Sequence, residues 1–219
     1  MLNNQLIRTA YPNLQLQDKV EFALQLMDDY DIHHLPVVSE DKFVGLVCKE
    51  DLLDVDETAV IAVLEDQWVR AAVKGEEYFL SSLKLANEHQ LSLVPVVNEQ
   101  GEVAGCIPSS ELLLLLGTFT GAADPGGVIV LEMDKRHFSF GEISRLVETN
   151  DAYITQLNTY QEPESGLFIV TLRINKAEIS DIVATFQRYE YAVRYYFGDE
   201  QYANELKSNY DHLLNYLNI

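Results

Sequence analysis

One sequence pattern occurs twice in the first half of the chain, and this internal repeat constrains the fold more than any other feature. The first copy consists of Leu35–Val38, Gly45 and Asp51, and the second consists of Val94–Val97, Gly105 and Glu111. Pro36 and Pro95 lie 59 positions apart, and the two glycines lie 60 positions apart. A repeat of this length indicates two copies of one supersecondary unit that bury their apolar faces together. The cleft between two such units is a favoured place for a small ligand.

The bulk composition predicts a globular protein of one or two domains. The chain has 219 residues, of which 47% are hydrophobic, enough for a substantial core. No apolar run approaches the roughly 18 residues of a membrane helix, and the first residues lack the features of a signal peptide. The two cysteines, Cys48 and Cys106, form no C-x-x-C pattern, which argues against a disulfide framework. We therefore expect a cytoplasmic protein.

The charge of the chain argues against two classes of partner. The net charge is −20, and residues 1–118 hold 20 acidic and 7 basic side chains, a balance of −13. Such a surface repels nucleic acids and anionic membranes. We expect neither as a partner.

The hydrophobic periodicity predicts the same order of elements in both copies. For the first copy we predict a helix over Leu16–Tyr30 capped by Asp18, strands over Ile32–Val38 and Phe43–Cys48, and a helix that begins at Asp51. For the second copy we predict a helix over Ser82–His89, strands over Leu91–Val97 and Val103–Ile107, and a helix over Ser110–Leu116. The repeats then cover about residues 1–60 and 61–118.

A glycine-rich stretch separates this half from the rest of the chain. Gly117 is predicted to end a helix, and residues 119–126 are predicted to form a linker. Beyond it we predict strands over Val128–Met133, Ile154–Tyr160, Leu167–Ile174 and Tyr191–Phe197, and helices over Phe140–Glu148 and Ala177–Tyr189. Ser139 and Glu142 form the Ser-x-x-Glu pattern of a capping box. The order β-α-β-β-α-β is that of the ferredoxin-like unit.

The chain is predicted to end in an amphipathic helix over residues 199–219. Its apolar side chains recur at steps of four and three residues, which places them on one face: Tyr202, Leu206, Tyr210, Leu213 and Leu217.

These patterns resemble two known families. The paired Pro-Val-Val strands, the glycine-bearing strands and the acidic residue six positions after each glycine resemble a tandem pair of CBS (cystathionine-β-synthase-type) domains over residues 1–118. Residues 127–198 look like an ACT-type domain. The resemblance implies an α+β fold, with a tandem CBS-domain pair followed by a C-terminal ferredoxin-like (ACT-type) domain.

CBS pairs are regulatory modules that bind adenosyl ligands between their repeats, and the resemblance implies such a site here. The family signature Gly-h-h-Thr-x-x-Asp (h, apolar) ends in an Asp that accepts hydrogen bonds from the ribose hydroxyls. The first copy keeps this residue as Asp51 but has Cys48 in place of Thr. The second copy has Pro108 in place of Thr and Glu111 in place of Asp. Asp51 is therefore the better ribose ligand, although both carboxylates could serve only to favour their helix N-termini.

By the same resemblance, the predicted adenosyl site also includes residues that flank the signature or precede the Pro-Val-Val strands. These are Lys49, His34, Pro36, Pro95 and Ser109. His33 and His34 could instead suggest a metal, but adjacent strand residues point to opposite faces. The acidic run that includes Asp54, Asp56 and Glu57 lacks the pattern of a calcium loop and reads as a solvated helix, so we predict no metal site.

The charge balance also bears on which ligand fits. Lys49, Arg70 and Lys74 are the local bases, and they act within a strongly acidic domain. This favours a monophosphate, or a neutral or cationic ligand such as S-adenosylmethionine, over a triphosphate. An adenosine nucleotide or S-adenosylmethionine is thus the expected effector, and no cofactor is certain.

The ACT-type resemblance implies an amino-acid effector at the loop between the first strand and helix of the second half. The residues there are Asp134, Arg136, His137, Phe138 and Ser139. The family usually carries a Gly just before the helix, and this chain does not. A folded dimerisation module is the alternative.

The predicted function is regulatory. The sequence has no nucleophile motif, no glycine-rich phosphate loop and no metal-ligand set, so we do not expect an enzyme. We expect a ligand-sensing homodimer in which an adenosyl ligand between the CBS repeats is coupled to an ACT-like dimer. The alternative is a ligandless dimerisation or scaffold protein with degenerate sites.

Overall fold

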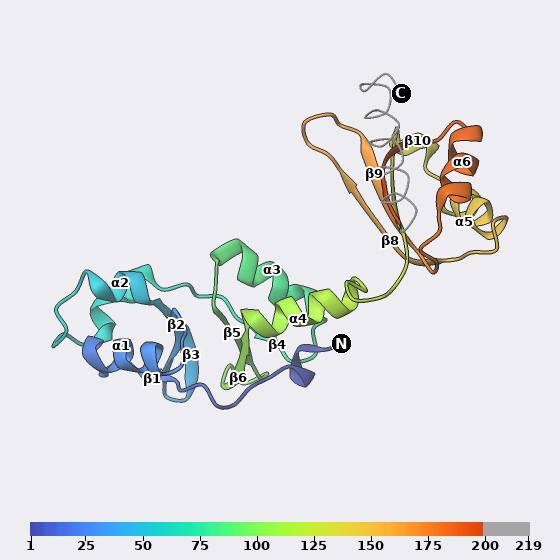
Figure 1. The fold of residues 1–219 in the computed structure, drawn as a ribbon. Coiled ribbons are helices and arrows are strands. Elements are labelled where there is room, and N and C mark those ends of the chain that lie inside the picture. The colour runs from blue at the N-terminus through green and yellow to red at the C-terminus, as the bar shows by residue number, and fades with distance from the viewer. Residues whose placement is uncertain (199–219) are drawn as a thin grey trace, which may run out of the picture. The chain divides into compact units, whose positions relative to one another are not determined.

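A computed structural model describes residues 1–198 of the chain. Two compact units are present: one spans Met1–Phe119, and the other begins at Thr120. Figure 1 shows the helices and strands of both units. Within residues 1–198, every helix is too short or too polar to cross a bilayer.

The first unit contains two repeats with the same topology. The first repeat comprises β1 (Leu14–Gln15), α1 (Val20–Asp29), β2 (His34–Ser39), β3 (Lys42–Cys48) and α2 (Lys49–Leu53). The second comprises β4 (Val73–Lys74), α3 (Leu80–His89), β5 (Leu93–Val97), β6 (Val103–Pro108) and α4 (Ser109–Phe119). Each forms a three-stranded sheet in which a short parallel pair is followed by an antiparallel hairpin. The duplicated supersecondary unit predicted from the repeat is confirmed.

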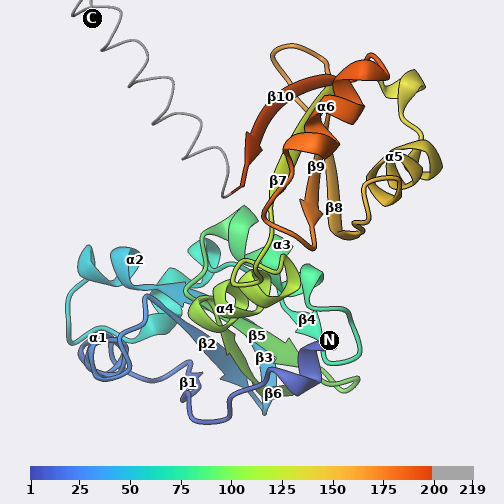
Figure 2. The same cartoon turned by 45° about the vertical axis from the view of Figure 1, so that its right-hand side comes forward.

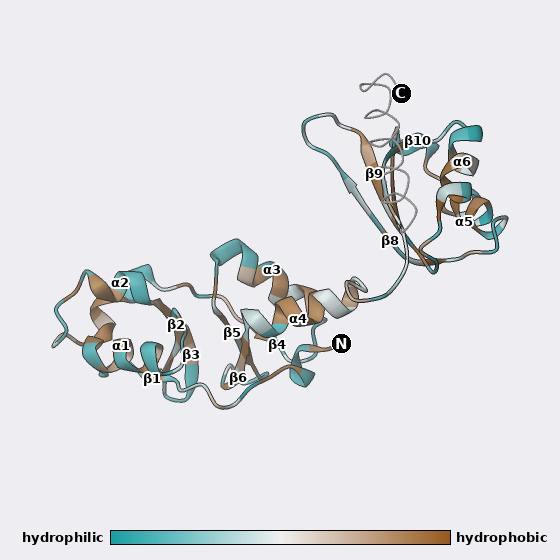
Figure 3. Ribbon diagram, in the orientation of Figure 1, coloured by the Kyte–Doolittle hydropathy of each residue, from teal (hydrophilic) through white to brown (hydrophobic). Residues whose placement is uncertain are grey.

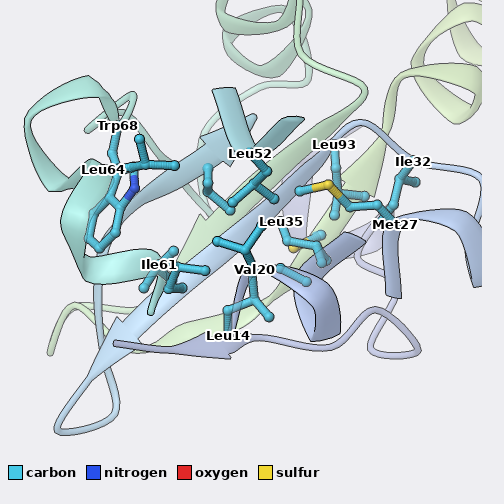
Figure 4. Close-up of a cluster of buried hydrophobic side chains, with 14 residues drawn as sticks. Leu14, Val20, Met27, Ile32, Leu35, Leu52, Ile61, Leu64, Trp68 and Leu93 are labelled. Carbon is cyan, nitrogen blue, oxygen red and sulfur yellow. The ribbon is translucent and has the colours of Figure 1, made fainter. Parts of the chain in front are cut away.

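Two short 3-10 helices complete this unit, η1 (Asn3–Gln5) at the N-terminus and η2 (Ile61–Gln67) between the repeats. Figure 1 shows α1 and α2 beside the sheet of the first repeat, and α3 and α4 beside the sheet of the second. The core of the first repeat also includes Leu93 and Cys106 from the second repeat. Figure 4 shows this cluster, with Trp68 beside Leu64 at one end and Met27 beside Ile32 at the other. The repeats therefore share buried surface.

Each repeat also lends a backbone segment to the other. Arg8 exchanges two backbone hydrogen bonds with Cys106, at 2.8 and 3.0 Å, and Val69 exchanges two with Leu46, at 2.9 and 3.2 Å. The crossing segments run over the strand glycines, which have no side chain to obstruct them. A Cβ on Gly45 would lie 2.8 Å from Trp68 Cβ, and one on Gly105 would overlap the side chain of Ile7. The repeated glycines are thus explained by close backbone approach.

Three predicted details of the first unit were wrong. Helix α1 begins at Val20, and Asp18 does not cap it, because the Asp18 carboxylate accepts a hydrogen bond from Gln15 N at 2.7 Å. Helix α2 begins at Lys49, which puts Asp51 inside its first turn. Helix α4 does not end at Leu116 but continues through Gly117 to Phe119. Tertiary packing outweighs the small helix penalty of one glycine.

The second unit is an antiparallel sheet with two helices. Its elements are β7 (Val128–Met133), η3 (Lys135–His137), α5 (Phe140–Glu148), β8 (Ile154–Gln161), β9 (Phe168–Ile174), α6 (Ser180–Arg188) and β10 (Ala192–Phe197). The sheet order is β10-β7-β9-β8, so the predicted β-α-β-β-α-β order is present. Figure 2 shows α5 and α6 on one face of this sheet. Figure 3 shows hydrophobic residues along β9 and in the two helices, and the buried core joins them: Ile129, Leu131, Ile143, Leu146, Val170, Leu172, Ile182 and Phe186.

Only one of the two hydrogen bonds of the predicted capping box of α5 is present. Ser139 Oγ accepts a hydrogen bond from Glu142 N at 3.4 Å, as expected. The Glu142 carboxylate does not return to the Ser139 backbone and instead accepts a hydrogen bond from the Tyr191 hydroxyl at 3.0 Å. The predicted C-terminal helix over residues 199–219 lies outside the described residues.

Candidate functional site

A cavity lies between the two repeats where the strands β2 and β5 begin. It has a volume of about 480 Å³ and is lined by His33, His34, Cys48, Glu50, His89, Gln90, Leu91 and Ser92. The two repeats contribute to it in equivalent ways. Lys49 N donates to His33 O at 2.8 Å, and Ser109 N donates to Ser92 O at 3.0 Å, so the first residues of α2 and α4 make matching bonds. The cavity is therefore part of the cleft that the internal repeat predicts.

His34 joins the two repeats as a neutral side chain. It is buried, and its Nδ1 accepts a hydrogen bond from Ser92 N at 3.2 Å, which requires that Nδ1 carry no proton. The Ser92 hydroxyl lies 3.2 Å from the same nitrogen and accepts a hydrogen bond from His33 N at 2.9 Å. Burial lowers the pKa of His34, which outweighs the opposite effect of the Glu50 carboxylate. His34 is thus a structural link between the repeats and not a cation.

Glu50 connects two further side chains of the cavity. One oxygen lies 3.1 Å from His33 Nδ1, and the other accepts a hydrogen bond from the Cys48 thiol at 2.5 Å. The bond from Cys48, together with bonds from the backbone and His33, lowers the pKa of Glu50 to about 2. Burial and the bond to Glu50 raise the pKa of Cys48 to about 11. Cys48 therefore stays protonated at neutral pH, in which form it is a poor nucleophile.

The carboxylates at the two signature positions differ in their surroundings. Glu111 Oε1 forms an ion pair with the Arg8 guanidinium at 2.8 Å. Arg8 pairs with the residue after Gly105, and Val69 pairs with the residue after Gly45, so Val69 occupies the equivalent place in the other repeat. A valine cannot form an ion pair. Asp51 is partly buried, and within residues 1–198 its carboxylate has no hydrogen bond or ion pair.

The other residues predicted for the adenosyl site have separate roles. Pro36 and Pro95 are buried within β2 and β5, opposite Leu46 and Cys106. Lys49 forms an ion pair with Asp28 of α1. The Ser109 hydroxyl donates to Leu91 O, and Ser109 lines a second cavity of about 430 Å³ between α3 and α4.

Of the eight predicted residues, His34 and Cys48 line the cavity between the repeats, and the other six do not. Sequence reasoning missed Ser92 and His89, which line it from the second repeat. Ser92 lies 59 positions after His33, the same spacing as the two prolines, so aligning the copies could have identified it.

The predicted effector loop of the second unit is largely engaged in local structure. Asp134 accepts a hydrogen bond from Arg136 N at 2.9 Å and forms an ion pair with its guanidinium at 2.8 Å, which lowers the pKa of Asp134. Phe138 packs edge-on against Phe168 at 5.2 Å. Only Asp134 and His137 of the five residues line the adjacent cavity of about 510 Å³, whose other titratable residues are Glu132, Glu142, Tyr189, Glu190 and Tyr191.

Among residues 1–198, no cluster of three or more His, Cys, Asp or Glu side chains is arranged to hold a metal ion. In the acidic run after α2, Asp56 accepts hydrogen bonds from the backbone and hydroxyl of Thr58, at 2.8 and 2.5 Å. Its carboxylate thus belongs to a turn.

The His34 link predicts that stability falls in mild acid. Because the folded state lowers the pKa of His34 below its ordinary value of 6.5, the unfolded chain binds the proton more tightly. Stability is therefore complete above about pH 6.5 and is lost as the pH falls towards the lowered pKa, by up to about 1.4 kcal/mol per pH unit. Protonation of the Glu50 carboxylate lowers the folding stability only at lower pH, between 4.5 and about 2.

Urea unfolding between pH 7 and 5.5 measures this slope. His34→Gln keeps an acceptor for Ser92 N but cannot titrate, so the variant should lose most of the slope. His89→Gln removes an exposed histidine of the same cavity and should retain it. A slope that is equal in the wild type and His34→Gln would contradict the prediction.

Comparison with known proteins finds a family model that matches the first repeat. Residues 5–57 match the family model described as the CBS domain. Among curated proteins, the chain is 27% identical over 110 residues to inosine-5′-monophosphate dehydrogenase of Thermoplasma acidophilum, and 25% identical over 115 residues to homoserine O-acetyltransferase of Methanosphaerula palustris. These matches cover 49% and 51% of this chain but only 22% and 23% of the two relatives.

The chain is also similar to proteins whose structures have been solved. A CBS domain pair/ACT domain protein of Thermotoga maritima is 26% identical, with a TM-score of 0.49, over 54% of this chain and 98% of that chain. A CBS domain pair in complex with 5′-methylthioadenosine and S-adenosyl-L-methionine is 20% identical, with a TM-score of 0.46, over 54% of this chain and 98% of that chain. The match to the CBS domain model covers the first repeat, and the second repeat has the same topology as the first.

Proposed function

We propose that this chain is a non-catalytic ligand-sensing regulatory protein whose CBS pair binds one adenosyl ligand through Asp51. The observation that carries the proposal is the difference between the two signature carboxylates. Glu111 is paired with Arg8, whereas Asp51 has no partner among residues 1–198. A ribose offers two neighbouring hydroxyl donors, and a carboxylate with both oxygens available can accept both. The adenosyl ligands implied by the CBS resemblance carry such a ribose.

The second position is less suited to the same ligand. Glu111 would have to share its oxygens with Arg8, and Pro108 lacks both the hydroxyl and the N–H that a threonine would offer. We therefore propose one ligand per chain.

Sensing would operate through the relative arrangement of the repeats. His34 and Ser92 join the repeats at one point, and the crossing segments at Arg8 and Val69 join them at two others. A ligand that contacts residues of both repeats favours the arrangement that fits it, by the difference between its affinities for the alternatives.

Thermal unfolding with and without ligand tests the proposal. S-adenosylmethionine, 5′-methylthioadenosine, AMP and ATP are added separately, and the matched guanosine nucleotides serve as controls. At least one adenosyl compound should raise the melting temperature, because a ligand that binds only the folded state stabilises it by about 2.7 kcal/mol at one hundred times its Kd. No shift with any of them would favour the alternative function, a ligandless scaffold. The Cys48–Glu50 bond favours that alternative, because it engages the side chain at the signature threonine position.

We further propose that the CBS pair forms a homodimer through its helices. Leu113 and Leu114 of α4 are 69% and 72% exposed, and Leu53 of α2 is 64% exposed. Leu53 and Leu113 lie 60 positions apart, so they are equivalent residues of the two repeats. A surface with this internal two-fold pattern suits a second copy of itself. Sedimentation should report about twice the chain mass of 24.9 kDa, and a monomer at micromolar concentration would contradict the proposal.

For the second unit we propose an ACT-like role in dimerisation. The ion pair between Asp134 and Arg136 supports this choice over amino-acid sensing, because it engages the arginine of the predicted loop that could bind an α-carboxylate.

A further inference from the structure

We infer that the ligand at Asp51 carries no phosphate group and that a positive charge on it strengthens binding; this inference rests on the proposed function. It follows from how the basic side chains around the Asp51 carboxylate are distributed. The strongest donors to a phosphate are cationic side chains that are not already neutralised.

The lysine within the signature and the arginine of the crossing segment over β3 are both engaged by carboxylates. Lys49 precedes Asp51 by two residues, and its ammonium group pairs with Asp28 of α1 while only 25% of the side chain is exposed. Arg70 follows Val69 on the crossing segment, and its guanidinium contacts both the carboxylate and the backbone oxygen of Glu65, at 3.2 and 3.3 Å. A phosphate would have to displace one of these carboxylates.

The two adjacent histidines of the neighbouring cavity, His33 and His34, do not supply the missing charge. His34 accepts a hydrogen bond from Ser92 N and is therefore neutral. His33 Nδ1 lies 3.1 Å from the Glu50 carboxylate, so this side chain is already engaged by an acidic group. His89, in the last turn of α3, is exposed to solvent and is the remaining histidine of the cavity lining.

The acidic side chains outnumber these bases. Glu50, Asp51 and Asp54 lie within or directly after the five-residue helix α2, and the single lysine of that helix is paired. The electrostatic potential at Asp51 is therefore negative. It repels a phosphate and attracts a sulfonium or ammonium group.

Calorimetric titration of the full chain with three adenosyl probes of different charge tests the inference. S-adenosylmethionine carries a sulfonium, 5′-methylthioadenosine is neutral at the same position, and AMP carries a phosphate. S-adenosylmethionine should bind more tightly than 5′-methylthioadenosine, and AMP should bind roughly tenfold more weakly than 5′-methylthioadenosine. Added salt should narrow the difference, because it screens the charges. Tightest binding of AMP would overturn the inference but leave the proposed function intact, whereas no binding of any probe would overturn both.

A variant of Asp28 tests whether the ion pair between Lys49 and Asp28 is what disfavours AMP. Asp28→Asn removes the partner of Lys49 and should raise the affinity for AMP several-fold relative to 5′-methylthioadenosine. The Asp28 side chain is 68% exposed, so the fold should tolerate the change. Glu40→Gln makes the same change in net charge at the turn between β2 and β3, at the opposite end of the strand from His34, and should leave the ratio unchanged. Equal AMP affinities in the wild type and Asp28→Asn would overturn the assignment.

Discussion

Replacing Asp51 by asparagine should weaken binding of the best adenosyl ligand by about 10- to 150-fold. A hydrogen bond to a charged group contributes about 1.5–3 kcal/mol, and asparagine replaces one carboxylate oxygen with an N–H₂ group that cannot accept a hydroxyl proton. Because Asp51 has no partner among residues 1–198, its loss should leave the fold stable. Calorimetric titration of the wild type and Asp51→Asn measures the effect.

Glu111→Gln is the matched control, because it alters the equivalent residue of the second repeat. It removes the ion pair with Arg8, which at 52% and 31% side-chain exposure contributes little to stability. Ligand affinity should stay within about twofold of the wild type. The fluorescence of Trp68, the single tryptophan of the chain, reports whether either variant remains folded, since this side chain is buried. Loss of binding in Glu111→Gln with Asp51→Asn unaffected would reverse the assignment of the site.

The repeat allowed much of the first unit to be predicted, because its signals are local. The alternation and spacing around Pro36 and Pro95 correctly place the β2–β3 and β5–β6 hairpins. From the sequence, Gly45 and Gly105 were identified only as equivalent positions of the repeat, without a structural reason for the glycine. Their physical reason, the crossing of Trp68 and Ile7 over the strands, depends on segments far away in the sequence.

The candidate site was less predictable, because long-range contacts define it. Arg8 and Glu111 are separated by 103 positions, and His34 and Ser92 by 58, so neither pair leaves a pattern in the sequence. The signature identifies Asp51 and Glu111 as equivalent residues. It cannot reveal that one of them is neutralised by an arginine from the N-terminal segment and the other is not.

The same limit applies in the second unit. The Ser-x-x-Glu pattern correctly gave Ser139 as the N-terminal cap of α5. It did not predict that Glu142 bonds to Tyr191, because that hydroxyl comes from the loop before β10, 49 positions later. Burial and this bond to a carboxylate raise the pKa of Tyr191 to about 12, so the hydroxyl remains a donor at neutral pH.

Gly105→Ala should be among the most destabilising single substitutions in the first unit. Its φ of +146° is a conformation that alanine rarely adopts, and the added Cβ would overlap Ile7 and lie 3.0 Å from Arg8 O. Backbone strain and overpacking each cost about 1–3 kcal/mol, so the expected loss is about 2–6 kcal/mol. For a chain of this size each kcal/mol lowers the melting temperature by roughly 2–4 °C.

Substitutions at two other glycines distinguish the contributions of backbone strain and overpacking to this loss of stability. Gly101 has a φ of +83°, but a Cβ added there would meet no atom of the described residues within 4 Å, so Gly101→Ala should show the backbone cost alone, about 1 kcal/mol. Gly117 lies within α4, and a Cβ added there would meet no atom of residues 1–198 within 4 Å, so Gly117→Ala should raise stability by up to about 1 kcal/mol, since alanine is the better helix former. Thermal unfolding of the three variants should therefore rank them Gly117→Ala, Gly101→Ala and Gly105→Ala from most to least stable. If Gly105→Ala is no less stable than Gly101→Ala, then the segment around Arg8 does not cross β6 as closely as described, and the pairing of Arg8 with Glu111 loses its structural basis.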